Sequence, residues 1–234
     1  MLIHRLSNNF SKLFFQSNAL KSQNDFYNRV KKSGLPCSVI YDIGAYHGDF
    51  SIALRNIFQK SKFYMFEADS KKEKFLKETG LPYYIALLSN TSGQKYFYSN
   101  NSSGDSYYKE TTKFYQNTTP TVINAVTLDN LVDAQSLPTP DIIKVDTQGS
   151  ELDILKGGLK TILNSTLIHL ECPIIMYNQG SPSLHEIVSF MATLNFIPSD
   201  IFECHTGIDG LIQVDIAFLK AESLKAYNSR NIMK

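Results

Sequence analysis

Short apolar runs alternate with longer amphipathic stretches along the chain from residue 39 onward. The apolar runs are rich in Val, Ile, Tyr and Phe, and each ends at a turn or a polar residue, as buried strands do. The stretches between them carry Lys and Glu on one helical face. This alternation predicts an α/β fold, in which helices cover both faces of a mostly parallel sheet. The predicted strands span residues 39–43, 63–67, 83–88, 142–146 and 167–171.

The amphipathic stretches predict helices between these strands. They span residues 51–60, 71–79, 151–163 and 183–194. Gly80 closes the second helix, and Ser150 is available as the N-cap of the third. Residues 196–201 and 212–219 flank a glycine-containing turn and predict a closing hairpin, so we expect the sheet to end with an antiparallel strand.

Two regions depart from this alternation. Residues 89–121 are crowded with Ser, Asn, Thr and Tyr around one strand-like piece at 95–99, and we interpret them as an insertion over the active edge of the sheet. Residues 1–36 form a predicted N-terminal helical extension, 37–222 the main domain, and 223–234 a C-terminal tail. One helical face of the extension carries Leu2, Ile3, Leu6, Phe10, Leu13 and Phe14. Its polar face has few cations, which favours docking as a lid or brace over binding to a membrane surface.

Composition and charge narrow the function classes. The chain has 23 Lys and Arg against 22 Asp and Glu, a net charge of +1, which provides no basic surface for nucleic acid. Three cysteines are too few for a disulfide scaffold and match no zinc spacing. No apolar run is long enough for a membrane span, and polar residues interrupt the N-terminus where a signal peptide needs an apolar core. We therefore expect a cytoplasmic protein.

The most informative segment is DIGAYHGDFS, residues 42–51, which links the first predicted strand to a helix. Gly44 and Gly48 permit a tight turn and close approach of a ligand, and the following helix offers free N–H groups. The next strand ends at Glu67, whose carboxylate can accept hydrogen bonds from a ribose diol. Both signals favour a nucleoside, against the alternative of a glycine turn that only packs a helix on a strand.

The turn discriminates between nucleoside cofactors. It reads G-x-x-x-G, with Ala45 and Tyr46 where a dinucleotide fingerprint would carry a glycine. Asp42 would repel a phosphate and favour the cationic head of S-adenosylmethionine. The predicted cofactor-binding residues are Asp42, Gly44, Ala45, Tyr46, Gly48, Ser51, Glu67, Ala68, Ala86 and Leu87.

Further motifs follow the turn. They are FEA at 66–68, TLDNL at 127–131, and IKVDTQGSE at 143–151 leading into LKGG at 155–158. Together they resemble the FkbM family of S-adenosylmethionine-dependent methyltransferases over roughly residues 39–219. The resemblance implies a Rossmann-like seven-stranded fold, S-adenosylmethionine as cofactor, and O-methylation of a sugar, polysaccharide precursor or secondary metabolite. The chain departs from the family in having Tyr46 where Asn is common, and Thr147 and Gln148 where Val-Glu is common.

Candidate catalytic residues lie at the ends of the fourth and fifth predicted strands. We expect Asp146 to act as base or to orient the acceptor hydroxyl, Glu171 to make a second acceptor contact, and Lys144 to pair with Glu151 or Asp146. Glu151 has an equally good structural interpretation, because an acid in a first helical turn complements the helix dipole. Asp146 and Glu171 could share a divalent cation, but two acids lack a third ligand, so we predict no metal.

Two other function classes stay open at this point. One is a dinucleotide-dependent oxidoreductase, which the missing glycine disfavours, and the other is a non-catalytic cofactor-binding protein of the same fold. For the methyltransferase the expected partner is a small-molecule or glycan acceptor, and the insertion at 89–121 is expected to select it, since Tyr107 or Tyr108 can stack on a sugar face.

Overall fold

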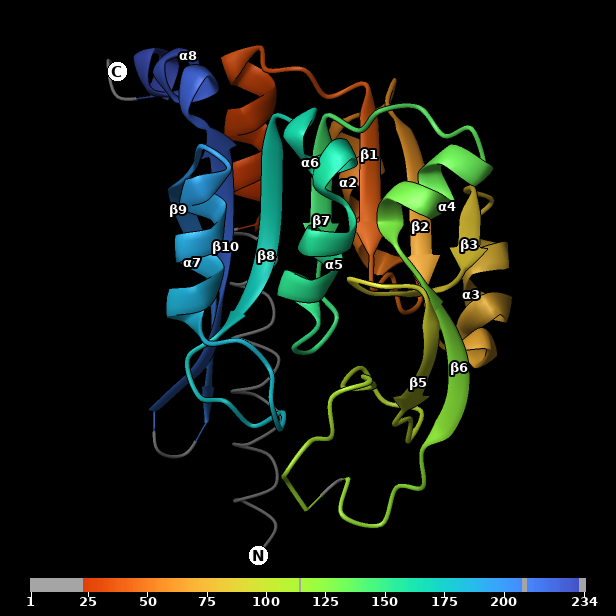
Figure 1. Ribbon diagram of the computed structural model, residues 1–234. Helices are drawn as coiled ribbons and strands as arrows, with labels where there is room; N and C mark the ends of the chain where they lie inside the picture. The colour runs from red at the N-terminus through yellow and green to blue at the C-terminus, as the bar shows by residue number, and fades with distance from the viewer. Residues whose placement is uncertain (1–22, 114, 208–209, 232–234) are drawn as a thin grey trace, which may run out of the picture.

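The centre of the computed structural model, which describes residues 23–113, 115–207 and 210–231, is a seven-stranded sheet (Figure 1). Its order is β3-β2-β1-β7-β8-β10-β9. The strands are β1 (Val39–Ile43), β2 (Lys62–Glu67), β3 (Tyr83–Ile85), β7 (Ile142–Val145), β8 (Leu167–Pro173), β9 (Phe196–Gly207) and β10 (Gly210–Lys220). The pairs from β3 to β8 are all parallel, whereas β10 runs antiparallel to both β8 and β9. The predicted fold class is therefore confirmed.

The direction of chain progression along the sheet reverses at β1. The chain moves outward from β1 to β2 and β3, and then returns to place β7 on the other side of β1. In open α/β sheets a ligand crevice forms beyond the carboxyl ends of the strands at such a switch point. The last strand, β10, inserts between β8 and β9 and so extends the sheet on the side of β7 and β8.

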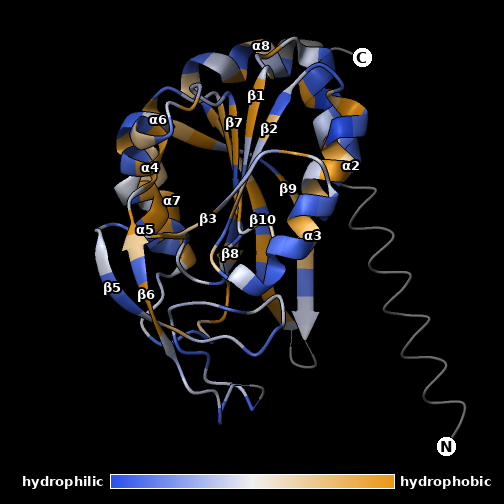
Figure 2. Cartoon of the chain, turned by 90° about the vertical axis from the view of Figure 1, so that its right-hand side faces the viewer, coloured by the Kyte–Doolittle hydropathy of each residue, from blue (hydrophilic) through white to orange (hydrophobic). Residues whose placement is uncertain are grey.

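Helices cover both faces of the sheet. They are α2 (Asp49–Ile57), the 3-10 helix η1 (Ser70–Lys72), α3 (Glu73–Glu78), α4 (Leu128–Ala134), α5 (Glu151–Gly157), α6 (Leu159–Leu163), α7 (Leu184–Thr193) and α8 (Ala221–Asn231). Figure 2 shows α4, α5, α6 and α7 on one side of the sheet and α2 and α3 on the other. The strands alternate buried side chains between two apolar clusters, one under each layer.

The prediction of one continuous helix at residues 151–163 is wrong, because the structure has two helices there. The segment divides into α5 and α6 at Gly158, where a Cβ atom would lie 2.8 Å from Leu128 Cδ2. Ser150 is the first flanking residue of α5, but its hydroxyl donates to the carbonyl of Thr147 and caps no helical N–H group. The carboxylate of Glu151 instead satisfies the backbone N–H groups before the helix.

The predicted strand at 83–88 is also divided. Residues Tyr83–Ile85 pair with β2, whereas β4 (Leu87–Leu88) belongs to a second sheet of order β4-β6-β5. That sheet includes β5 (Gly93–Phe97) and β6 (Thr121–Val126), so the insertion at 89–121 supplies one strand and a long loop. Figure 1 places the small sheet and its loop below the carboxyl ends of the main strands.

The two ends of the described chain pack against the main sheet. Residues 23–33 are helical and bury Phe26, Tyr27 and Val30 in the same cluster as Tyr227 of α8. The apolar face predicted between Leu2 and Phe14 lies outside the described residues. The segment predicted as a C-terminal tail begins inside α8.

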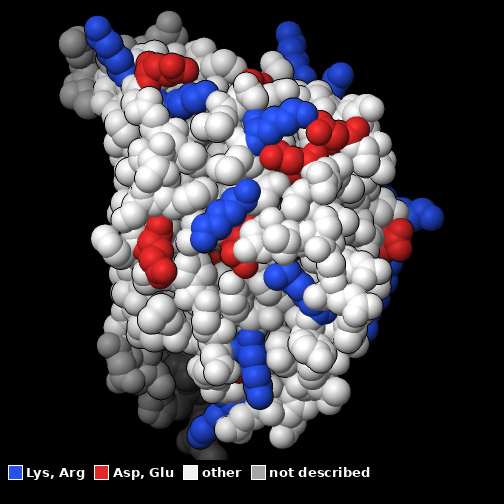
Figure 3. All heavy atoms as spheres, viewed as in Figure 1, with Lys and Arg blue, Asp and Glu red and all other residues white. Residues whose placement is uncertain are grey.

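The described part of the chain contains no helix long and apolar enough to cross a membrane. On the face seen in Figure 3, positive and negative side chains are interspersed among uncharged ones. This face therefore presents no extended surface of one charge.

Candidate functional site

A cavity of about 530 Å³ opens at the carboxyl ends of the central strands. The turn after β1, the end of β2 and the segment after β3 line one part of it. The other part is lined by the turn after β7, by β8, β9 and β10, and by the insertion. The cavity thus lies at the switch point of the sheet, where the topology predicts a ligand site.

The glycine turn is held against two neighbouring strands. The N–H groups of Gly44 and Ala45 donate to the carbonyl of Phe66 at 2.9 and 3.1 Å. Gly44 has φ +77°, and a Cβ atom there would lie 1.8 Å from the carbonyl oxygen of Asp146. Only glycine allows the turn to pass this close to the β7 turn. Tyr46 also has a positive φ of 50°, a conformation that asparagine adopts more readily.

Glu67 ends β2 and faces the cavity. Its Oε2 accepts from the N–H of Tyr46 at 2.8 Å, and its Oε1 accepts from the N–H of Asp69 at 2.9 Å. Burial raises the pKa of Glu67, although these backbone donors oppose the shift. A carboxylate has about four acceptor positions, so the two backbone donors orient Glu67 and leave capacity for a ligand diol.

Six of the ten residues predicted to bind the cofactor line the cavity. They are Gly44, Tyr46, Glu67, Ala68, Ala86 and Leu87. The other four, Asp42, Ala45, Gly48 and Ser51, do not line it. Gly48 precedes α2, where a Cβ atom would lie 2.8 Å from Thr79 Cγ2, so its absent side chain serves packing between α2 and α3.

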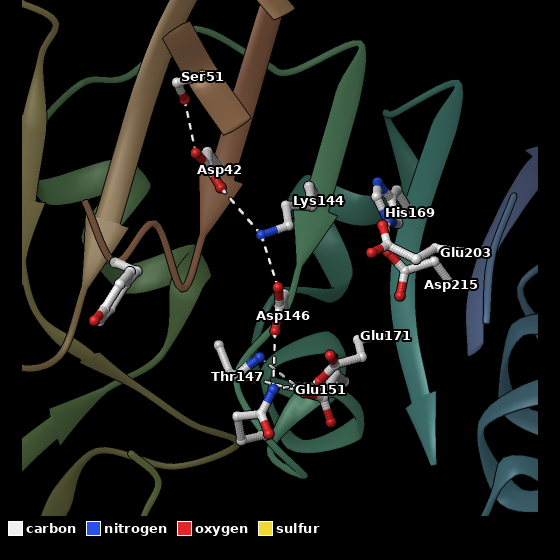
Figure 4. A network of polar contacts seen from close by, with 12 residues as sticks. Asp42, Ser51, Lys144, Asp146, Thr147, Glu151, His169, Glu171, Glu203 and Asp215 are labelled. Carbon is white, nitrogen blue, oxygen red and sulfur yellow. Dashed lines mark hydrogen bonds and ion pairs between the residues drawn. The ribbon is translucent and has the colours of Figure 1, made fainter. Parts of the chain in front are cut away.

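Asp42 lies behind the cavity wall and is fully buried. Its Oδ2 accepts from the hydroxyl of Ser51 at 2.7 Å, and its Oδ1 lies 3.7 Å from Lys144 Nζ (Figure 4). Burial raises the pKa of Asp42, with Lys144 and Ser51 opposing the shift. The expectation that this carboxylate faces the cationic head of a cofactor is therefore not supported, because its charge faces Lys144.

Lys144 connects Asp42 to Asp146. Its Nζ lies 3.0 Å from Asp146 Oδ2, so it pairs with Asp146, one of the two predicted partners, and with Asp42 in place of Glu151. Burial alone would raise the pKa of Asp146, but the charge and hydrogen bond of Lys144 outweigh it and the pKa is lowered. Asp146 is therefore an ionised acceptor at the cavity surface at neutral pH.

Gln148 joins two of the predicted catalytic carboxylates. Its Nε2 lies 3.3 Å from Asp146 Oδ1 and 2.5 Å from Glu171 Oε2. Gln213 donates to the other oxygen of Glu171. Burial, followed by the charges of Asp146 and Asp215, raises the pKa of Glu171. A neutral amide at position 148 thus stabilises two acids that a glutamate there would repel.

Glu151 is fully buried behind the turn after β7. Its carboxylate accepts from the N–H of Thr147 at 2.9 Å and from the N–H of Gly149 at 3.0 Å. Burial raises its pKa to about 7 despite these donors. Glu151 does not line the main cavity, and its contacts hold the turn that carries Asp146 and Gln148.

Among the cavity residues that the sequence did not mark as site residues, three with titratable side chains lie on the closing hairpin. Glu203 and His205 lie on β9, and Asp215 lies on β10. Asp215 pairs with Glu171 of β8 on one side and with Glu203 of β9 on the other. Directly paired residues point to the same face of a sheet, so these three carboxylates project from one face. No motif in the sequence marked these three positions. His47, in the glycine turn, does not line the cavity; its ring stacks on Tyr46 at 3.8 Å between centroids.

The residues present fit S-adenosylmethionine. Glu67 retains acceptor capacity beside the glycine turn, and the small or apolar side chains of Ala68, Ala86 and Leu87 offer a wall for an adenine ring. The carboxylates of Asp146, Glu171, Glu203 and Asp215 face the same cavity. This excess of negative charge suits a sulfonium and disfavours the pyrophosphate of a dinucleotide.

Comparison with known proteins agrees with this geometry. Residues 42–198 match the family described as the methyltransferase FkbM domain. No curated protein matches the chain. A solved structure of the methyltransferase FkbM from Methylobacillus flagellatus KT is similar, with a TM-score of 0.52 and 14% identity over 77% of this chain. This chain spans 43% of the length of that protein.

Two other solved structures are more distantly similar. The M. capricolum protein TrmK in complex with S-adenosyl-homocysteine has a TM-score of 0.46 and 13% identity, over 82% of this chain and 67% of that one. Magnesium protoporphyrin IX methyltransferase from Synechocystis PCC 6803 with bound SAM has a TM-score of 0.47 and 10% identity, over 88% of this chain and 84% of that one. With TM-scores below 0.5, neither bears on the function of this chain. The match to the family covers more than half of the sequence, and the chain belongs to the FkbM family of S-adenosylmethionine-dependent methyltransferases.

Proposed function

We propose that this protein transfers a methyl group from S-adenosylmethionine to a hydroxyl group of a sugar, polysaccharide precursor or secondary metabolite. The observation that carries the proposal is a single acidic cavity with two different walls. One wall is the glycine turn with Glu67, and the other is the polar insertion together with Asp146 and Glu171. The first suits a nucleoside and the second a polyol.

Six cavity residues hold the cofactor in this proposal. Glu67 receives the ribose hydroxyls, Gly44 and Tyr46 border the methionine part, and Ala68, Ala86 and Leu87 border the adenine. When bound, S-adenosylmethionine supplies an electrophilic methyl group on a positively charged sulfur. The side chains around it need only bind and orient, and orientation of two reactants can contribute about 7 to 11 kcal/mol to a transfer reaction.

Asp146 accepts a hydrogen bond from the acceptor hydroxyl in this proposal and directs its lone pair. Lys144, 3.0 Å from Asp146 Oδ2, keeps that carboxylate ionised and fixes its position. Glu171 makes a second contact with the acceptor, and Gln148 sets the spacing between the two acids. Glu151 acts as a positioning residue through its bonds to the backbone of Thr147 and Gly149.

The insertion supplies the acceptor wall. Ser102, Ser103, Asp105, Ser106 and Tyr107 line the cavity with hydroxyl, carboxylate and aromatic groups. Tyr107 also lines a neighbouring open cavity of about 410 Å³, together with Tyr96, Tyr98 and Tyr108. Aromatic faces beside hydroxyl groups are suited to sugars, so these residues favour a glycan or another polyol as the acceptor.

We also propose that the methyltransferase domain spans residues 37–222 and that the protein is cytoplasmic. The match at 42–198 lies inside the proposed domain. The helix at 23–33 nonetheless packs into the same apolar cluster as the sheet.

Binding of S-adenosylhomocysteine, measured by calorimetry, tests the cofactor part of the proposal. We expect saturable binding to the purified chain, and an affinity about 10²-fold lower in Glu67→Ala, because hydrogen bonds to a charged group contribute about 1.5 to 3 kcal/mol each. The matched control is Glu73→Ala, which removes an exposed carboxylate from neighbouring α3 and should leave the affinity unchanged. A folded wild-type protein that binds no S-adenosylhomocysteine would refute the proposal.

Transfer of a labelled methyl group tests the role of Asp146. With an acceptor from a screen of glycans and hydroxylated metabolites, we expect Asp146→Asn to lower kcat about 10²-fold, the lower end of what a proton-accepting side chain contributes. Because Asp146 is assigned to the acceptor, the affinity for S-adenosylhomocysteine should stay within a few fold of the wild type. An unchanged kcat would remove Asp146 from the reaction. If the screen finds cofactor binding without turnover on any acceptor, a non-catalytic role would be favoured.

A further inference from the structure

Three potential metal ligands meet where β8, β9 and β10 border the cavity. Glu171, His205 and Asp215 each offer one ligand atom, a carboxylate oxygen or an imidazole nitrogen, and these atoms lie within 4.8 Å of one another. All three residues line the cavity. They come from three adjacent strands, so the sheet itself sets their spacing.

Asp215 carries an unsatisfied oxygen. The residue is 7% exposed, and among the described residues its Oδ1 has no hydrogen-bond partner. Its Oδ2 lies 3.0 Å from His169 Nε2, which fixes the orientation of the carboxylate. A buried carboxylate oxygen without a donor is costly, and a cation is the group that would satisfy it.

The other two ligands are also prepared for coordination. Both oxygens of Glu171 accept hydrogen bonds from amides, those of Gln148 and Gln213, which orient the carboxylate as outer-shell partners orient metal ligands. The side chain of His205 is 43% exposed, and its Nε2 lies 3.4 Å from Glu203 Oε1. Such a side chain can adjust to close on an ion held by the two fixed carboxylates.

The local charge favours a cation as well. Glu171 on β8 and Glu203 on β9 are the ladder partners of Asp215 near the middle of β10, so three carboxylates lie on adjacent strands (Figure 4). Lys144, which lines the same cavity, is already paired with Asp42 and Asp146. A divalent ion between Glu171 and Asp215 would offset the repulsion between these neighbouring carboxylates.

We propose that Glu171, His205 and Asp215 bind a divalent first-row metal ion, for which Mn²⁺ is the best match. Carboxylates suit Mg²⁺ and Mn²⁺, and imidazole suits the transition metals, so Mn²⁺ is compatible with the whole set. Three protein ligands leave coordination positions open toward the cavity. This inference revises the expectation of no metal, which rested on a third ligand being absent.

The ion would bind and orient neighbouring hydroxyl groups of the acceptor. This role rests on the proposed function, whereas the metal site itself rests only on the arrangement of the three side chains. The two parts are therefore tested separately, and metal binding is measured without cofactor or acceptor.

Titration of the chelator-treated full chain with Mn²⁺ tests the site, with calorimetry and the electron paramagnetic resonance signal of free Mn²⁺ as readouts. We expect one ion per chain and an affinity at least about tenfold lower in His205→Ala, since even outer-shell changes lower metal affinity by about 10- to 100-fold. The side chain of His205 is not part of the buried core, so this variant should fold, and a thermal unfolding curve checks that it does.

The matched control is His185→Ala, which removes an exposed histidine of α7 that does not line the cavity, and should bind Mn²⁺ as the wild type does. Absence of saturable binding by folded wild-type protein, or equal affinity in His205→Ala and the wild type, would overturn the inference. Binding of S-adenosylhomocysteine, measured on the same samples, separates the two proposals. If the wild-type protein binds Mn²⁺ but no S-adenosylhomocysteine, only the proposed methyltransferase function is contradicted.

Discussion

Replacing Gly44 by alanine is expected to lower the free energy of unfolding by about 2 to 5 kcal/mol. A left-handed conformation costs a residue with a Cβ atom about 1 to 2 kcal/mol, and displacing packed atoms costs about 1 to 3 more. Gly44 has φ +77°, and its Cβ would lie 1.8 Å from the backbone oxygen of Asp146. Since that oxygen belongs to the β7 turn, the turn or the sheet must shift.

Gly80→Ala is the control for this prediction. Gly80 has φ +70°, but no atom lies within 4 Å of the position that a Cβ atom would occupy, so only the conformational cost of about 1 to 2 kcal/mol applies. Chemical denaturation of both variants gives the comparison, and calorimetry should show weakened S-adenosylhomocysteine binding in Gly44→Ala alone. Equal losses of stability would mean that the close approach of the two turns is not important.

Replacing Lys144 by methionine is expected to destabilise the protein by about 3 to 5 kcal/mol, the usual result of removing one partner from a buried ion pair. Lys144 is 7% exposed and lies between Asp42 and Asp146. Its loss leaves two carboxylates facing each other with no cation between them. Lys160→Met, which breaks an exposed pair with Asp133, should leave the free energy of unfolding nearly unchanged.

The pH dependence of this difference has a definite sign. Lys144 lowers the pKa of Asp146, so in the wild type this carboxylate stabilises the fold above its unfolded pKa of about 3.9, and the contribution is lost as the pH falls. Without Lys144 the carboxylates protonate at higher pH. We therefore expect the gap between wild type and Lys144→Met to be largest near neutral pH and to shrink in acid. A gap independent of pH would show that lost packing, and not charge, causes the destabilisation.

The main strands could be predicted because parallel strands are buried on both faces and so appear as continuous apolar runs. The same property concealed the break at Ala86. Residues 83–88 are uniformly apolar or aromatic, and only pairing with β6, more than thirty positions later, draws Leu87 and Leu88 into another sheet. A local pattern does not contain that information.

The cavity lining could be predicted where it depends on one turn, and not where it depends on strand register. Gly44, Glu67 and Asp146 lie next to strand ends, which the sequence marks. Glu203 and His205 reach the cavity through a long hairpin whose ladder shifts between Leu211 and Gln213 and again after Asp215. Asp42 was assigned to the cofactor for its charge at a strand end. Its pairing with Lys144 across β1 and β7 depends on register, which the local sequence does not reveal.

The buried contact between Tyr27 and His169 connects the first described helix to Asp215, a residue that lines the cavity. The Tyr27 hydroxyl lies 2.9 Å from His169 Nδ1, and the opposite ring nitrogen meets Asp215. A shortened version of the chain that starts at the first strand would remove the Tyr27 ring, expose the buried His169 to water and loosen the support of Asp215. Expression boundaries for crystallography or assay should therefore be drawn upstream of this helix.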